Sequence, residues 1–188
     1  LKAKKIPISF KMSSKKETRQ DAIYELIAER LTVGVEDLDN YENPMDRGTR
    51  LEPDAISTFE LEKNLKVERT GFVEHDDNAF IGYSPDGLIE GKEDEDVEVK
   101  CPGGKNYVKM WFTNVVPTDY YWQMVQAFIV NPKLMKRYFV GYHPDIPIHS
   151  IHIIEVTRES IVEDIEKARV AQEVVLEEVD KTLESLIK

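Results

Sequence analysis

The sequence predicts an α/β fold in which a central mixed β-sheet is flanked by helices on both sides. Apolar residues recur at helical spacing in the first part of the chain, and short β-type runs separated by Gly, Asp and Asn occupy the middle. Two helical segments, two strand-like segments and a last helix then follow from residue 103. With 188 residues, of which 41% are hydrophobic, the chain is long enough for one domain with a substantial core.

The helices are predicted from apolar residues three and four positions apart. Pro53 is tolerated near a helix start, so the second helix is expected to begin at Leu51 or Glu52. Thr118 is the expected N-cap of a later helix. The predicted helices cover residues 18–31, 51–64, 103–114, 117–131 and 158–187.

The strands are predicted from short β-type runs bounded by turn residues. No internal repeat, low-complexity tract or linker interrupts the chain, so residues 1–188 are expected to form a single domain. Within it, residues 1–17 form a basic segment and residues 158–187 a long terminal helix, whose buried side is expected to hold Ile161, Ile165, Ala168, Val175 and Leu176. The predicted strands lie within residues 65–73, 79–84, 87–91, 96–102, 136–143 and 148–156.

The charge of the chain is acidic overall but uneven. The net charge of −11 by itself argues against a nucleic-acid-binding protein, because phosphate contacts need Lys and Arg. Residues 1–20, however, carry seven bases and one acid, whereas residues 151–188 carry ten acids and five bases. The basic end is therefore either a surface that faces a polyanion or a solvated tail.

Several residue types have structural rather than chemical interpretations. The lone cysteine, Cys101, excludes an internal disulfide, fits a reducing compartment and is expected to be a small buried residue. No apolar run approaches the ~18 residues of a membrane span, so we expect a cytoplasmic protein without a membrane partner. His143, His149 and His152 match no zinc pattern and are expected at surface or strand positions. Most aromatic residues are expected in the core, with Trp111 or Trp122 exposed.

Two charged residues alternate with two valines in the predicted strand over residues 96–100. Side chains alternate between the two faces of a strand, so Val97 and Val99 are expected to face the core. Glu98 and Lys100 then share the opposite face, about 7 Å apart along the strand. A carboxylate and an ammonium are thereby placed side by side.

A third charged residue, Asp86, is pinned between a proline and a glycine upstream. A hairpin through residues 90–96 would return the chain beside Asp86, so that its carboxylate approaches that of Glu98. Two converging carboxylates repel each other unless a cation is present, and oxygen ligands suit Mg²⁺. An ammonium beside such an ion could orient a water molecule and meet charge on a phosphate, which suits phosphodiester hydrolysis.

The same residues also have a purely structural interpretation. Glu and Lys two positions apart are common as a solvated pair on an exposed strand, and Asp-Gly is a common turn dipeptide. Each element alone therefore says little about catalysis, whereas their joint order on short strands is more specific.

Residues 84–88 followed by residues 98–102 (SPDGL and EVKCP) resemble the core motif of the phage lambda exonuclease-like recombination nucleases, within the PD-(D/E)XK superfamily. The likeness extends to an upstream helix that carries Glu52 and to a downstream Tyr/Gln helix in which Gln123 matches the active-site glutamine. It covers residues 20–170. The resemblance implies a restriction-endonuclease-like core.

The resemblance also implies a metal site. Asp86 and Glu98 would hold one or two Mg²⁺ or Mn²⁺ ions, with the main-chain carbonyl of Val99 and the carboxylate of Glu52 as further ligands. By itself, an acidic residue in a first helical turn, as expected for Glu52, is also favourable to the helix dipole.

The remaining roles implied by the resemblance concern water and DNA. Lys100 would position the attacking water, and Gln123 would hydrogen-bond near Lys100 or the scissile phosphate. The family's N-terminal Arg and Thr-Ala-Ser segment is not found, and Val125 stands where a second Gln is common. Candidate DNA-binding residues are Lys11, Lys15, Lys16, Arg19 and Arg47.

As a member of such a family, the protein is expected to digest linear double-stranded DNA from the 5′ end. The product would be a 3′ overhang for a single-strand annealing partner, in a phage or prophage protein of a bacterial host. Relatives form ring trimers, in which a basic channel could coexist with an acidic outside. Two alternatives remain: a PD-(D/E)XK endonuclease or repair nuclease, and a non-catalytic DNA-binding module.

Overall fold

The computed structural model describes residues 16–33 and 43–187, and these form an α/β fold built on a five-stranded mixed sheet. This confirms the predicted fold class. The strands follow the order β1-β4-β5-β6-β7, and β2 and β3 form a separate hairpin. Their bounds are β1 Val67–Glu68, β2 Val73–His75, β3 Asn78–Tyr83, β4 Gly87–Ile89, β5 Glu95–Lys100, β6 Lys136–Tyr142 and β7 Ile151–Thr157.

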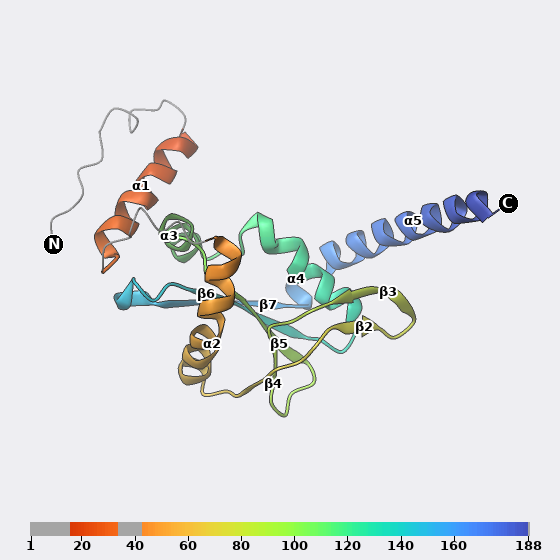
Figure 1. The fold of residues 1–188 in the computed structure, drawn as a ribbon, viewed down its shortest axis with the longest axis horizontal. Coiled ribbons are helices and arrows are strands. Elements are labelled where there is room, and N and C mark those ends of the chain that lie inside the picture. The colour runs from red at the N-terminus through yellow and green to blue at the C-terminus, as the bar shows by residue number, and fades with distance from the viewer. Residues whose placement is uncertain (1–15, 34–42, 188) are drawn as a thin grey trace.

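Helices lie on both faces of this sheet (Figure 1). On one face, α2 packs against β5 and β6, and its buried residues are Leu51, Ala55 and Phe59. The other face is covered by α3 and α4, with α1 packed on α3. The helices are α1 Lys16–Leu31, α2 Pro44–Lys63, α3 Gly104–Thr113, α4 Thr118–Val130 and α5 Val162–Ile187.

The strand β5 is the centre of the sheet. It pairs antiparallel with β4, where Gly87 lies opposite Val97, and parallel with β6, where Glu98 lies opposite Phe139. A parallel pair needs a long crossover connection, and here α3 and α4 supply it. β5 thus has a strand on each side and helices over both faces. Charged side chains on this strand can be buried for that reason.

The second helix begins earlier than the sequence predicted. It starts at Pro44, where the side chain of Asn43 accepts a hydrogen bond from the backbone N–H of Met45 at 3.0 Å. The expected start at Leu51 or Glu52 was wrong, because the turns before Leu51 bury no apolar residue and leave no periodic signal. Pro53 consequently lies inside the helix, where it removes one main-chain donor.

The cap of α4 also differs from the prediction. Thr118 is the first helical residue and Pro117 is the N-cap, without a side-chain hydrogen bond. The carbonyl of Pro117 accepts from the N–H groups of Tyr120 and Tyr121 at 2.9 and 3.1 Å. The proline fixes the entry into the helix, so the Thr118 hydroxyl is not needed as a cap.

The terminal helix is shorter and less covered than expected. A 3₁₀ turn over Glu159–Ile161 precedes α5, which begins at Val162. Ile165 is buried as predicted, but Val175 is 58% exposed. Figure 1 shows the reason, since α5 runs away from the sheet toward the C-terminus and its later turns leave the body of the molecule. Among the described helices, none is both long enough and apolar enough to cross a membrane.

Candidate active site

Asp86 lies in the short connection between β3 and β4, beside the end of β5. Its backbone N–H donates to the carbonyl of Val97 at 3.1 Å, and its Oδ2 accepts from the N–H of Val99 at 2.6 Å. The N–H and C=O of one strand residue point to the same strand edge. The carbonyl of Val99 therefore faces the side on which the Asp86 carboxylate lies.

Glu98 projects from the opposite face of β5 to the valines, as predicted. Its side chain is only 2% exposed, which rules out a solvated surface pair. Oε1 accepts from Lys100 Nζ and, at 2.7 Å, from Gln123 Nε2, whereas Oε2 accepts from Arg137 Nη2 at 3.2 Å. Residues from β5, α4 and β6 thus fix the orientation of this carboxylate.

Two members of this buried cluster were missed by the sequence reasoning. Arg137 on β6 is fully buried, and its Nε donates to Asp96 Oδ1 at 2.7 Å. Asp96, the last residue of the acidic run 93–96, is also fully buried. A signal was available, because Asp96 precedes Glu98 by two residues and so shares its face of the strand.

The pKa of Asp86 is raised by burial and by neighbouring carboxylates. Burial, and to a lesser extent the negative charges of Glu98 and Glu52, raises the pKa of Asp86 to about 6. The N–H of Val99 and the ammonium of Lys100 act in the opposite direction. Three carboxylates from β5, α2 and the β3–β4 connection are therefore close enough to interact.

These residues fit a divalent cation by the chemistry of their donors. The described residues contain no ready-made group of three or more ligating Asp, Glu, His or Cys side chains. Mg²⁺, however, usually keeps several waters and takes only one or two carboxylates. Asp86 and Glu98 supply those carboxylates, and a cation would offset both the burial and the negative charge of Glu98 that raise the pKa of Asp86.

Lys100 and Gln123 complete the cluster on the side of α4. The ammonium of Lys100 lies 5.5 Å from the ring centre of Tyr120, and its side chain is 23% exposed. Gln123 is exposed on α4 while its amide reaches Glu98. The site therefore opens to solvent around these two side chains, while Glu98 and Arg137 lie beneath them.

The predicted DNA-binding residues are spread over several parts of the chain. Lys11 and Lys15 lie outside the described residues, and Lys16 opens α1. Arg19 is exposed on α1, which packs mainly on α3. Arg47 on α2 donates from Nε to the carbonyl of Cys101 at 3.3 Å, so it lies next to the end of β5.

Other interpretations made from sequence have clear outcomes. Cys101 packs with the valine side of β5, and burial raises the pKa of its thiol to about 11, so it stays protonated. His143 was expected at the surface or in a strand but is fully buried after β6, and burial lowers its pKa to about 4. Trp122 is 51% exposed, whereas Trp111 stacks on His149 with ring centres 4.8 Å apart.

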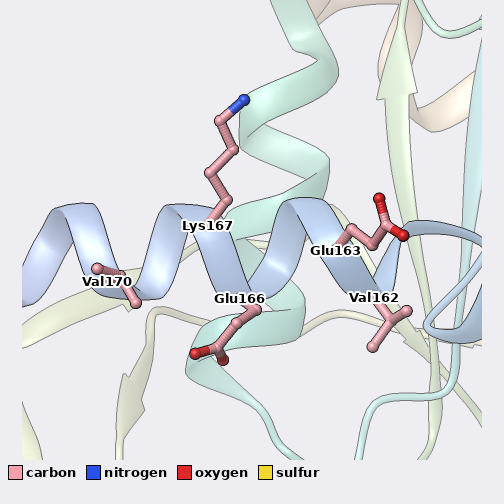
Figure 2. A pocket seen from close by; sticks show the side chains of 5 residues that line it. All are labelled: Val162, Glu163, Glu166, Lys167 and Val170. Atoms are coloured by element: carbon pink, nitrogen blue, oxygen red, sulfur yellow. The ribbon is translucent and has the colours of Figure 1, made fainter.

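A surface hollow of about 570 Å³ lies along α5, away from this cluster (Figure 2). It contains none of the predicted site residues, and its walls come from one helix. The lining residues are Val162, Glu163, Glu166, Lys167 and Val170.

Comparisons with known proteins bear on the family and the fold of the chain. A family model described as the YqaJ-like viral recombinase domain matches residues 8–132. A crystal structure of an alkaline exonuclease from Laribacter hongkongensis aligns with 25% identity over 95% of this chain and 91% of that chain, with a TM-score of 0.59. The same enzyme in complex with dAMP aligns with 26% identity over the same shares of both chains and a TM-score of 0.61.

One further solved structure is less similar, and one search found no match. A phage-related exonuclease from Haemophilus somnus aligns with 18% identity over 83% of this chain and 79% of that chain, with a TM-score of 0.46. A search of curated proteins found no significant match.

Proposed function

The chain belongs to the YqaJ-like viral recombinase family and is a DNA exonuclease of that type, and from this premise we propose a divalent-metal-dependent hydrolysis of DNA phosphodiesters at the Asp86–Glu98–Lys100 cluster. We further propose that residues 1–188 work as one nuclease domain. The neighbouring solved enzyme is an alkaline exonuclease, and its complex contains dAMP, a nucleotide product of DNA digestion.

The observation that carries this proposal is the convergence of three charged groups at one end of β5. Asp86 is held by the N–H of Val99, and Glu98 is held by Lys100 and Gln123. Burial, with the charge of Glu98 as a second cause, makes the ionised form of Asp86 unfavourable and raises its pKa. Such a group is better explained by a ligand than by stability.

Asp86, Glu98, the carbonyl of Val99 and Glu52 are the proposed ligands of one or two Mg²⁺ or Mn²⁺ ions. A bound divalent ion would supply charge neutralisation at the scissile phosphate and lower the pKa of water. Lys100 would hold the attacking water and offset negative charge that develops on the phosphate. Gln123 would hold the Glu98 carboxylate in its position beside Lys100, since its amide already donates to Glu98.

The proposal also covers the direction of digestion, the DNA product and the assembly of the protein. We infer 5′-to-3′ digestion of linear double-stranded DNA, which leaves a 3′ overhang for a single-strand annealing protein. A homotrimeric ring would bring the basic residues 1–17 toward DNA and leave the acidic α5 outside. The setting would be the cytoplasm of a bacterial host.

One experiment separates this function from its alternatives. Linear duplex DNA labelled at the 5′ or 3′ end, and closed circular DNA of the same sequence, are incubated with the protein in Mg²⁺ or in EDTA. We expect early release of the 5′ label from linear DNA in Mg²⁺ only, with the circle intact. Cleavage of the circle would indicate an endonuclease, and no cleavage of any substrate would contradict the proposal.

Asp86→Ala serves as the active-site control, and Asp76→Ala as the matched control on the β2–β3 hairpin. We expect the first variant to lose cleavage and the second to keep it. Full activity in Asp86→Ala would remove the site assignment without touching the fold.

A further inference from the structure

Arg137 is the largest fully buried side chain among the described residues, and its guanidinium lies directly beneath the candidate active site. It bridges two acidic residues of β5, because Nε donates to Asp96 Oδ1 at 2.7 Å and Nη2 donates to Glu98 Oε2 at 3.2 Å. All of these side chains are at most 2% exposed. A charge removed this far from water is retained only with close partners.

The same guanidinium also contacts the other segments that build the site. Nη1 donates to the main-chain carbonyl of Gln123 on α4 at 3.1 Å. The guanidinium carbon lies 5.3 Å from the ring centre of Tyr83, the last residue of β3 and three positions before Asp86. Arg137 therefore joins β6 to β5, α4 and the segment that leads to Asp86.

The two carboxylate oxygens of Glu98 have different hydrogen-bond partners. Oε2 faces inward to Arg137, whereas Oε1 faces Lys100 and Gln123 at the open side of the cluster. A carboxylate without an anchor on one oxygen can rotate. The anchored one presents the same oxygen to the open side in every molecule.

We propose that Arg137, paired with Asp96, is a positioning residue that anchors Oε2 of Glu98 and so presents Oε1 to the divalent ion and to Lys100. This inference rests on the proposed function. Arg137 does not touch DNA or the reacting atoms. Its effect passes through the Glu98 carboxylate.

Stability alone is a poor explanation for this pair. Buried ion pairs can often be replaced by apolar residues of similar volume without loss of stability, whereas removal of one partner is strongly destabilising. The double variant Asp96→Leu/Arg137→Met removes both charges and keeps an apolar fill, so it is expected to fold. It leaves Asp86, Glu98, Lys100 and Gln123 in place but removes the anchor of Glu98.

The double variant is compared with wild type in three measurements. We expect kcat on linear duplex DNA to fall by about 10–100-fold and the Kd for Mn²⁺, measured by titration calorimetry without DNA, to rise by a similar factor, as is typical when a partner of a ligand is removed. The KM for DNA should stay within about twofold of wild type, because no DNA contact is removed. Thermal unfolding in EDTA reports the fold.

A matched pair of single variants covers the case in which the double variant does not fold. Arg158 is a partly buried arginine whose guanidinium donates to the carbonyls of Phe128, Asn131 and Leu134, away from the site. Arg137→Lys and Arg158→Lys both lose the planar guanidinium but keep the charge. We expect both to lose thermal stability, and only Arg137→Lys to lose kcat and Mn²⁺ affinity.

Glu98→Gln separates failure of this inference from failure of the proposed function. If Glu98→Gln cleaves DNA like wild type, the active-site assignment itself is wrong. If Glu98→Gln is inactive while folded Arg137→Lys and the double variant keep wild-type kcat and Mn²⁺ affinity, Arg137 is a structural residue only. Equal losses of kcat in Arg137→Lys and Arg158→Lys would also overturn a positioning role.

Discussion

Lys100 illustrates at the residue scale how burial changes the meaning of a common pair. Glu98 and Lys100 occupy one face of β5, as they would in any exposed strand, yet α4 and β6 enclose Glu98. An exposed Glu–Lys pair contributes at most about 1 kcal/mol and needs no precise partners. Here Lys100 contacts both a buried carboxylate and the ring of Tyr120.

We predict that Lys100→Ala damages the chemical step more than ion binding. Turnover should fall by about 10²–10³, the loss typical of one deleted electrostatic stabiliser. Mn²⁺ and DNA should still bind, because Asp86 and Glu98 remain. Lys100→Arg should not restore full turnover, since a planar guanidinium is not a compact point charge. Single-turnover cleavage at saturating Mn²⁺ measures this, and a near-normal rate would make the pair structural.

The raised pKa of Asp86 predicts a pH-dependent stability in the absence of metal. The folded-state pKa of about 6 lies above the ordinary value of 3.8, so the folded state binds more protons and stability falls as pH rises through this window. Asp86→Asn carries no such charge and keeps an acceptor for the N–H of Val99. In EDTA, it should therefore be more stable than wild type by about 2 kcal/mol above pH 6, with no difference below about pH 4.

Urea unfolding of wild type and Asp86→Asn at pH 4 and pH 8 provides the measurement. A difference in unfolding free energy that is the same at both pH values would show that the Asp86 carboxylate is not destabilised in the fold. Mg²⁺ at pH 8 should stabilise wild type and leave the variant unchanged.

At the element scale, the short strand β4 depends on a close approach to β1. The Asp-Gly dipeptide at its start looks like a turn, but Gly87 does not have a positive φ. Instead, a Cβ at Gly87 would lie 2.2 Å from Cγ1 of Val67 and 3.2 Å from the carbonyl oxygen of Glu68. The glycine therefore allows β1 to pack beside the residue that follows Asp86.

We predict that Gly87→Ala is destabilising by about 1–3 kcal/mol, because the added methyl group would clash with β1 where it pairs with β4. Gly71→Ala is the matched control, since a Cβ there has no neighbour within 4 Å, and it should change stability by no more than about 0.5 kcal/mol. Val67→Ala should partly rescue Gly87→Ala. Chemical denaturation is carried out on wild type, the three single variants and the Val67→Ala/Gly87→Ala double variant, and additive effects of the two substitutions would argue against the clash.

At the scale of the whole molecule, acidic and basic residues are separated along the chain. The acidic end forms α5, which leaves the body of the molecule (Figure 1), and the basic residues gather at the other end of the sequence. Local potential rather than net charge governs the approach of DNA. A protein with a net charge of −11 can therefore still bind DNA through one basic surface.

We predict that removal of residues 1–15, just before α1 begins, weakens DNA binding and reduces its salt dependence, because fewer counterions are released. Affinity for duplex DNA at several salt concentrations tests this. The variant should retain Mn²⁺ binding, which depends on residues far along the sequence. Unchanged affinity and slope would identify the segment as a solvated tail. Light scattering of the full chain tests the trimer, and a monomer would remove the ring proposal.

Local signals located most helices and strands and part of the site, although the strand predicted over residues 65–73 is two short strands, β1 and β2, in different sheets. The alternation of Val97 and Val99 with Glu98 and Lys100 fixed the faces of β5, because a strand has a period of two. Asp86 directly precedes β4, which runs antiparallel to β5, and this places its carboxylate near that of Glu98. The start of α2 was not predictable in this way, because its first turns bury no apolar residue.

Only the tertiary structure decided which charges are buried. Asp96 ends an acidic run and Arg137, 41 residues later, is the second residue of β6, and nothing in either local sequence pairs them. The parallel pairing of β5 with β6, together with α4 above both, removes these side chains from water. A buried charge must find a partner within reach, so the long-range packing of two strands and a helix, rather than any motif, determines that Arg137 holds Glu98.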